Sequence, residues 1–392
     1  MTAHGYTIAT ILSAASSVSR TLLVGRLRWR RPVLMGLVAL AFLSVNPVKQ
    51  AAAKPPFLPA QGSTSPENGD LNPYGLAVVP NGFPSGALQP GQLLVSNFNN
   101  SAADGNVQGE GSTIVTMDPG TAQQISVFFQ GTTPIGFTNA LGIVKEGFVF
   151  AGSVFTTAAN PAGQNGGLLV IDHLGHLVTT IMTGINGPWG LAIREKDDGA
   201  LLFVSNVLDG TVTRIEVSFK GGFNTVGSAT TIADGYLFGP DGAGLVVGPA
   251  GLAYDRKKDL LYVASEDDNE IFAIADASTT TSSVGKGTLV FADPTHLHGP
   301  LGLMIAPNGN LVTANADPDA HVDPTQPSEL VEFTVKGTFV RQFSIDPNNG
   351  SAFAILNTSV KGANQFAYVD DFVSSLSIVR LAQGGGSSNQ DE

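Results

Sequence analysis

The sequence predicts an all-β protein, a six-bladed β-propeller built from four-stranded antiparallel blades. Three observations lead to this fold class. Glycine is abundant, with 47 residues in 392, and the sequence contains no long stretch with helical periodicity. Short apolar runs separated by turn residues fill the chain instead. One motif also returns six times, at intervals that suit a four-stranded unit. Such units cannot bury both faces alone, so they pack as blades around a central axis.

The recurring motif is a Pro-x-Gly segment that we expect to form the innermost strand of each blade. Its glycine suits a strand position where close backbone approach leaves no room for a side chain. An array of β-sandwiches is the alternative, but it does not require the same motif before every fourth strand. Four close copies and then two looser ones are Asn72–Val78, Gly187–Ile193, Gly248–Tyr254, Gly299–Ile305, Asn139–Val144 and Gly350–Ile355.

The sixth unit lacks a fourth strand, and this predicts how the ring closes. Residues 71–383 hold the blades, and residues 384–392 form a Gly/Ser tail that we expect to be disordered. The missing outer strand should come from the N-terminal segment 54–70, near Phe57. Three prolines restrict that segment to an edge position: Pro55, Pro56 and Pro59.

Residues 1–53 are predicted to be a signal peptide. They contain six basic residues and no Asp or Glu. A basic cluster, Arg26–Arg31, precedes the apolar run Pro32–Val45, and Ala51–Ala53 suits a signal peptidase. The alternative is an uncleaved membrane anchor, but the apolar run is shorter than the roughly 20 residues that a spanning helix needs. We therefore expect export to the periplasm or the extracellular space, with a mature chain that begins at Lys54.

Charge and composition narrow the partners of the mature chain. Without residues 1–53 it has 14 basic and 32 acidic residues, a net charge near −18. Nucleic acids and anionic membrane surfaces require a basic footprint, so both are excluded as partners. The chain has no cysteine, which excludes disulfides, thiolate metal sites and a cysteine nucleophile. We expect a monomer that is not embedded in a membrane and that binds a protein or a small molecule.

At these motifs the chain resembles the NHL-repeat and gluconolactonase-like propellers, over Leu71–Leu381. Similar six-bladed proteins include lactonases, strictosidine-synthase-like proteins, streptogramin lyases and units that only bind partners, so the resemblance implies a fold and not one activity. In the lactonase-like family a divalent cation lies on the axis, held by Glu, Asn and Asp side chains at the start of the innermost strands. The matching positions here are Tyr74, Leu141, Trp189, Ala250, Leu301 and Ser351.

None of these six residues is a carboxylate, so the metal-dependent lactonase site is not matched and no cofactor is predicted. Two of the six are aromatic. Tyr74 and Trp189 could form a floor that stacks on a ligand, or they could fill the axis as core. A second set of positions, at the ends of the second strands, would give a polar ring at the same face. Such a mouth is the usual place for a binding site, although Asn and Asp also satisfy turn backbones. The ring comprises Asn97, Gly152, Asn206, Ser265, Asn315 and Asp370.

Two histidines and two acidic loops are further candidates. His296 and His298 precede the fifth innermost strand, and strand-like alternation would project both to one side. They suit turn hydrogen bonds or, with further ligands, a metal. The loop Glu266–Asn269 is expected to be solvated. A second loop has alternating oxygen donors, which would suit a peripheral calcium ion as an alternative to solvation; these donors are Asp317, Asp319 and Asp323.

The sequence names no catalytic residue. The leading hypothesis is a secreted or periplasmic NHL-like propeller that binds a protein partner or small ligand at one face of the ring. The alternative is a hydrolase or lyase with an active site near His296 and His298. The candidate ligand-binding residues are Tyr74, Asn97, Trp189, Asn206, His296, His298, Asn315 and Asp370.

Overall fold

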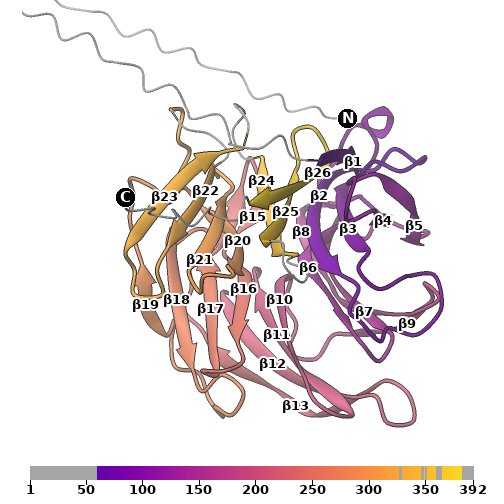
Figure 1. Cartoon of the computed structure of the whole chain (residues 1–392), viewed down its shortest axis with the longest axis horizontal. Helices are drawn as coiled ribbons and strands as arrows, with labels where there is room; N and C mark the ends of the chain where they lie inside the picture. The colour runs from indigo at the N-terminus through magenta and orange to yellow at the C-terminus, as the bar shows by residue number, and fades with distance from the viewer. Residues whose placement is uncertain (1–59, 326–328, 346–347, 349–350, 359–363, 382–392) are drawn as a thin grey trace, which may run out of the picture. The chain divides into compact units, whose positions relative to one another are not determined.

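A computed structural model describes residues 60–325, 329–345, 348, 351–358 and 364–381. These residues form six four-stranded antiparallel sheets, and the innermost strand of each contacts the innermost strands of its two neighbours (Figure 1). The described residues contain one short 3-10 helix, η1 (Ala102–Asp104), and no helix with the length and hydrophobicity to cross a membrane. The predicted fold class, a six-bladed propeller, is confirmed.

The blades follow one another along the chain, and each runs from an innermost to an outermost strand. Blade 1 consists of β2 (Leu71–Val78), β3 (Leu93–Asn99), β4 (Thr113–Met117) and β5 (Gln124–Gln130). Blade 2 consists of β6 (Phe137–Val144), β7 (Phe148–Thr157), β8 (Asn160–Asp172) and β9 (Leu177–Ile181). Blade 3 consists of β10 (Pro188–Glu195), β11 (Gly199–Asn206), β12 (Thr211–Ser218) and β13 (Asn224–Ala233).

Blades 4 to 6 repeat this order. Blade 4 consists of β16 (Pro249–Asp255), β17 (Leu260–Ser265), β18 (Glu270–Ala275) and β19 (Thr288–Phe291). Blade 5 consists of β20 (Pro300–Ile305), β21 (Leu311–Asn315), β22 (Glu329–Phe333) and β23 (Phe339–Ser344). Blade 6 consists of β24 (Ala352–Asn357), β25 (Asn364–Asp370), β26 (Ser375–Leu381) and β1 (Ala60–Ser63).

Strand β1 closes the ring from the N-terminal segment, as the sequence predicted. It pairs antiparallel with β26, with Ala60 opposite Ile378 and Ser63 opposite Ser375. The strand therefore begins three residues after Phe57, which lies outside the described residues. The predicted signal peptide and the tail 384–392 also lie outside them.

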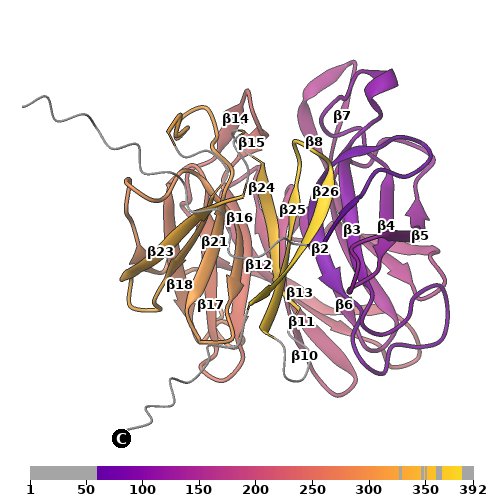
Figure 2. The same cartoon turned by 45° about the horizontal axis from the view of Figure 1, so that its top comes forward.

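A hairpin between blades 3 and 4 was not predicted. It consists of β14 (Gly239–Asp241) and β15 (Leu245–Val247). Figure 2 shows this hairpin and the long strands β7 and β8 rising on the same side of the ring, and β8 contacts β15. These additions extend beyond the repeated blade, and the turn of the hairpin lines a cavity at the mouth of the axis.

All six innermost strands have a β-bulge near their start, and in blades 1, 3, 4 and 5 this bulge coincides with the Pro-x-Gly motif. In blade 3 the pairing of β10 with β11 shifts register between Pro188 and Gly190, and the other five innermost strands show a comparable shift. A bulge interrupts the alternation of side chains between the two faces of a strand and so changes the direction of a side chain. The residue between Pro and Gly thereby turns to the axis, where such residues from different blades join one buried cluster.

The motif glycines face the next blade. A Cβ atom on Gly190 would lie 2.0 Å from the carbonyl oxygen of Ala250, and one on Gly251 would lie 2.2 Å from that of Leu301. A hydroxyl beside the glycine also reaches across, because Ser205 Oγ donates to the Ala250 carbonyl at 2.6 Å. The expected lack of room is confirmed, and the obstacle is the backbone of the neighbouring innermost strand.

Candidate functional site

The axis is filled by aromatic side chains. Tyr74 and Trp189 are each 1% exposed. The Tyr74 ring lies 4.6 Å from the ring of Phe98, 5.7 Å from that of Trp189 and 4.3 Å from that of Phe353, measured between centroids. Of the two interpretations of this pair, the core interpretation describes Trp189, whereas Tyr74 also lines a cavity described below.

Two of the six expected axial positions were wrong. Leu141 packs in a separate core cluster with Leu94 and Val149, because the bulge in β6 extends from Phe137 to Leu141 and places the leucine beyond the axis. In blade 6 the axial residue is Phe353. Ser351 lies before β24, and its carbonyl accepts a hydrogen bond from the Asp371 amide. Because this copy matches the motif only loosely, the sequence alignment placed the axial position two residues too early, at Ser351.

The expected polar ring is buried and serves the fold. Asn97, Asn206, Asn315 and Asp370 are each at most 2% exposed. Asn97 Nδ2 donates to the carbonyl of Thr64 at 3.0 Å and to Thr113 Oγ1 at 3.1 Å. The other three make similar bonds to turns and neighbouring side chains. These side chains therefore hold the ends of the second strands to neighbouring turns by hydrogen bonds. They are not exposed to a ligand at the mouth of the axis.

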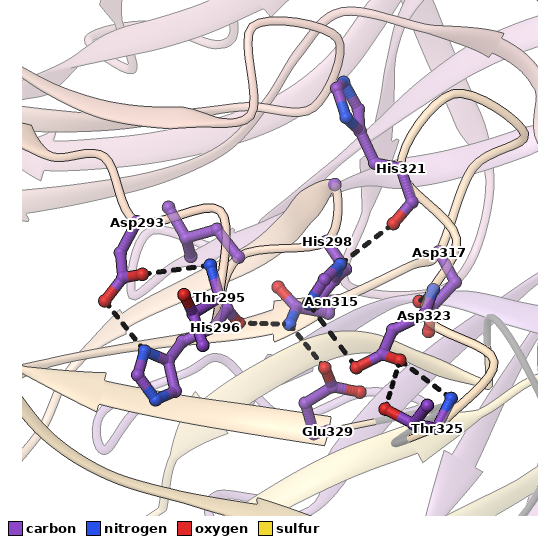
Figure 3. Close-up of polar contacts among 12 residues, drawn as sticks. Asp293, Thr295, His296, His298, Asn315, Asp317, His321, Asp323, Thr325 and Glu329 are labelled. Atoms are coloured by element: carbon purple, nitrogen blue, oxygen red, sulfur yellow. Dashed lines mark hydrogen bonds and ion pairs between the residues drawn. The ribbon is translucent and has the colours of Figure 1, made fainter. Parts of the chain in front are cut away.

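The side chains of His296 and His298 point in different directions, whereas the sequence predicted that both would project to one side. They lie in a turn between β19 and β20, where strand alternation does not apply. His296 Nδ1 is 2.7 Å from Asp293 Oδ2, and its ring stacks on Phe339 at 3.7 Å (Figure 3). His298 turns instead to the loop after β21.

His298 meets two carboxylates there (Figure 3). Its Nε2 is 3.5 Å from Asp323 Oδ2, and one ligand atom from each of His298, Asp323 and Glu329 lies within 4.8 Å of the other two. Glu329 is fully buried. Its burial, reinforced by the nearby negative charges of Asp317 and Asp323, raises the pKa of Glu329 to about 8.

The two acidic loops are not simply solvated. In the first, Glu266 is 3% exposed, and Asp268 Oδ1 forms an ion pair with Lys286 Nζ at 2.6 Å. In the second, the three calcium candidates diverge. Asp323 faces His298, Asp317 Oδ1 accepts from the Asp323 amide at 2.9 Å, and Asp319 Oδ2 accepts from the Gly242 amide at 3.2 Å. These oxygens therefore do not surround one peripheral ion.

A cavity of about 110 Å³ opens above the aromatic core. Its three carboxylates belong to the first or second residue after a second strand, and the turn of hairpin β14–β15 covers it. An amide of Asp319 donates to Asp241 Oδ2 at 3.0 Å and so ties the hairpin to blade 5. The lining residues are Tyr74, Ala243, Gly244, Glu266, Ala316, Asp317, Pro318, Phe353 and Asp371.

The cavity is strongly acidic. Burial raises the pKa of Glu266 well above its usual range, and the negative charges of Asp241 and Asp267 add to the effect. Glu266 Oε2 has no hydrogen-bond partner among the residues that the structure describes. Burial likewise raises the pKa of Tyr74, with contributions from Asp371, Glu266 and Asp241. A positive group in this cavity would relieve the repulsion among these charges.

Sequence reasoning placed the acidic loops at the periphery and missed this lining. The positions of the acidic residues relative to the strand ends could have revealed this lining. Glu266 and Asp371 are the first residues after β17 and β25, and Asp317 is the second after β21. Because the second strands end at one face, the residues just beyond them converge on the mouth of the axis. Glu329, which begins β22, follows the second acidic loop in sequence but was not among the three residues considered as calcium ligands.

Neither the protein-family models nor the curated proteins include a match to this chain. Solved structures do match. A candidate gluconolactonase is 12% identical, with 84% of this chain and 97% of that chain covered and a TM-score of 0.50. Catalytically inactive virginiamycin B lyase from Staphylococcus aureus is 14% identical, with coverages of 83% and 86% and a TM-score of 0.49.

The calcium-binding protein regucalcin from Agrobacterium tumefaciens is 10% identical, with coverages of 81% and 94% and a TM-score of 0.48. At these identities the likeness concerns the fold alone. In fold, this chain is a six-bladed propeller similar to gluconolactonase-like and regucalcin-like proteins and to virginiamycin B lyase.

Proposed function

We propose that this propeller is a binding protein whose axial cavity takes a small organic cation, such as the ammonium group of an amine. The observation that carries the proposal is Glu266, a buried carboxylate whose Oε2 finds no hydrogen-bond partner within the described part of the chain and which lines the cavity. An unpaired buried charge is costly, so Glu266 keeps its proton until a positive partner offsets the charge. A cationic ligand supplies the missing partner.

The rest of the lining supports an organic cation. Asp317 and Asp371 add carboxylates, and none of the nine lining residues is basic. Tyr74 and Phe353 add aromatic rings, which attract cations through their faces. A calcium ion would need six to eight oxygen ligands, whereas about half of this lining is aromatic or aliphatic. The volume suits an ammonium group on a short aliphatic stem.

Binding is tested by calorimetric titration of the full protein with methylammonium, ethylammonium and tetramethylammonium, and with ethanol as a neutral probe. We expect the cations to bind and ethanol not to bind. Glu266→Gln should weaken the binding of ethylammonium about tenfold or more, because a hydrogen bond to a charged group contributes about 1.5–3 kcal/mol. Thermal melts of both proteins show whether the variant is folded.

Glu67→Gln is the matched control, since Glu67 is exposed and does not line the cavity. It should bind the amines as the unchanged protein does. Equal affinity of Glu266→Gln for ethylammonium would contradict the proposal. So would a cavity that rejects all three ammonium ions but binds calcium in a Glu266-dependent way.

We further propose that the protein acts outside the cytoplasm, on the basis of the basic, apolar and small-residue segments in residues 1–53. Expression of the full sequence in a bacterium with an active secretion pathway should give a soluble product that begins at Lys54. Intact-mass analysis of the periplasmic and membrane fractions measures this. Recovery of the full-length chain from the inner membrane would contradict the proposal.

A hydrolase or lyase is the second candidate function, and one observation favours it. His298 Nε2 lies beside Asp323 and Glu329, which is an arrangement that can move a proton. His296 does not share this site, since it is paired with Asp293 and stacked on Phe339. The alternative therefore rests on His298 alone.

A further inference from the structure

Three elements of blade 5 bring His298, Asp323 and Glu329 together, and neither the axial cavity nor its proposed ligand involves them. His298 lies in the turn before β20, Asp323 in the loop after β21, and Glu329 is the first residue of β22. The side chains of His298 and Asp323 are 14% and 11% exposed, and Glu329 is fully buried. The cluster is therefore buried at Glu329 and partly accessible to solvent at His298 and Asp323.

Hydrogen bonds fix the orientation of each side chain from behind (Figure 3). His298 Nδ1 is 3.1 Å from the carbonyl oxygen of His321, an acceptor, so Nδ1 carries a proton, and in the neutral ring the lone pair on Nε2 faces the cluster. Asp323 Oδ1 accepts from the amide and the hydroxyl of Thr325, at 2.7 and 2.6 Å, which leaves Oδ2 toward His298. Asn315 Nδ2 donates to Glu329 Oε1 at 3.0 Å.

The atoms that converge are therefore a ring nitrogen and carboxyl oxygens, which can each bind a metal ion through a lone pair. His298 Nε2 and Glu329 Oε2 are buried, and neither has a hydrogen-bond partner among the described residues. Buried polar atoms that lack a partner are unfavourable. A cation beside them would satisfy His298 Nε2 and Glu329 Oε2 at once.

The geometry points to a divalent transition-metal site, with His298 Nε2 and one oxygen each of Asp323 and Glu329 as protein ligands. One imidazole with two carboxylates is a ligand set for zinc or manganese, whereas calcium and magnesium prefer oxygen alone. The 3.5 Å between His298 Nε2 and Asp323 Oδ2 is close to the separation of about 3.4 Å between two ligands on a tetrahedral zinc ion.

The hydrogen bonds behind the ligands match those of known metal sites. A metal-bound histidine usually donates its other ring N–H to a carbonyl or carboxylate, and metal-bound carboxylates are themselves hydrogen-bonded. The His321 carbonyl, Thr325 and Asn315 have these roles here. With three protein ligands, a tetrahedral ion would keep one position for water or a ligand.

The test is a titration of the full protein with Zn²⁺ after removal of metals by a chelator. We expect one zinc ion per chain and a rise in melting temperature on binding. Glu329→Gln and His298→Gln should each weaken zinc binding by more than the 10- to 100-fold that is typical for loss of an outer hydrogen-bond partner. Asn315→Ala should fall within that 10- to 100-fold range.

His176→Ala is the matched control, because His176 also pairs with an aspartate, Asp172, but is exposed and lies in blade 2. It should bind zinc unchanged. Circular dichroism and melts without metal separate misfolding from ligand loss. Zinc binding that survives both ligand substitutions would overturn the proposal, as would a folded protein that binds no zinc. A site lost in Glu266→Gln but kept in Glu329→Gln would place the ion in the axial cavity and overturn it too.

Discussion

Gly251→Ala and Gly190→Ala are each expected to destabilise the protein by about 3 kcal/mol, the upper part of the range for overpacking. The added Cβ would lie 2.2 Å from the Leu301 carbonyl oxygen in the first case and 2.0 Å from that of Ala250 in the second. Both obstacles are backbone atoms of the next innermost strand, so no side-chain rotation relieves the clash. Two neighbouring blades must move apart. Chemical denaturation of each variant measures the loss.

Gly239→Ala is the control for this pair. It is also a strand glycine, in β14, but a Cβ there would meet no atom within 4 Å. Its free energy of unfolding should change by less than about 0.5 kcal/mol. If all three variants unfold at the same denaturant concentration, the motif glycines do not hold the blades in close contact.

The stability of the protein without bound ligand is expected to fall as the pH rises above about 4.5, partly because of Glu266. Burial raises the pKa of Glu266 in the folded state, and Asp241 and Asp267 add to the effect. Above the unfolded pKa, the folded state therefore holds a proton that the unfolded state has lost. The free energy of unfolding then declines toward the raised folded pKa, with a slope of at most about 1.4 kcal/mol per pH unit for one group.

Denaturation of the wild type and of Glu266→Gln between pH 4 and pH 8 measures this slope. The variant should be as stable as the wild type near pH 4 and more stable near pH 8, since its amide never ionises. Glu67→Gln should follow the wild type throughout. Parallel curves for the wild type and Glu266→Gln would show that Glu266 ionises as freely in the fold as in the unfolded chain.

The repeated motif by itself predicts most of the fold. Each copy of the motif needs three further strands to bury its faces, and six copies close a ring. The four close copies, which contain Pro-x-Gly, also need a close backbone approach at the glycine. The missing sixth outer strand also predicted closure by the N-terminal segment, which β1 provides. These inferences succeeded because they depend on local pattern and on spacing along the chain. The two loose copies failed in detail, since the bulge before Leu141 and the offset at Phe353 leave little trace in sequence.

The candidate sites were decided by the tertiary structure. An asparagine such as Asn97 can contact a ligand or can be buried and hydrogen-bonded to a turn. Which of these occurs depends on the turn that lies within reach of its amide, and that turn is distant in sequence. Glu266 and Asp371 are separated by about a hundred residues, and Glu329 lies more than thirty residues beyond His298. Sequence alone determined that acidic residues follow the second strands of blades 4, 5 and 6. Only the closed ring decided that they converge, because its curvature turns the ends of separate blades toward one axis and buries their charges together.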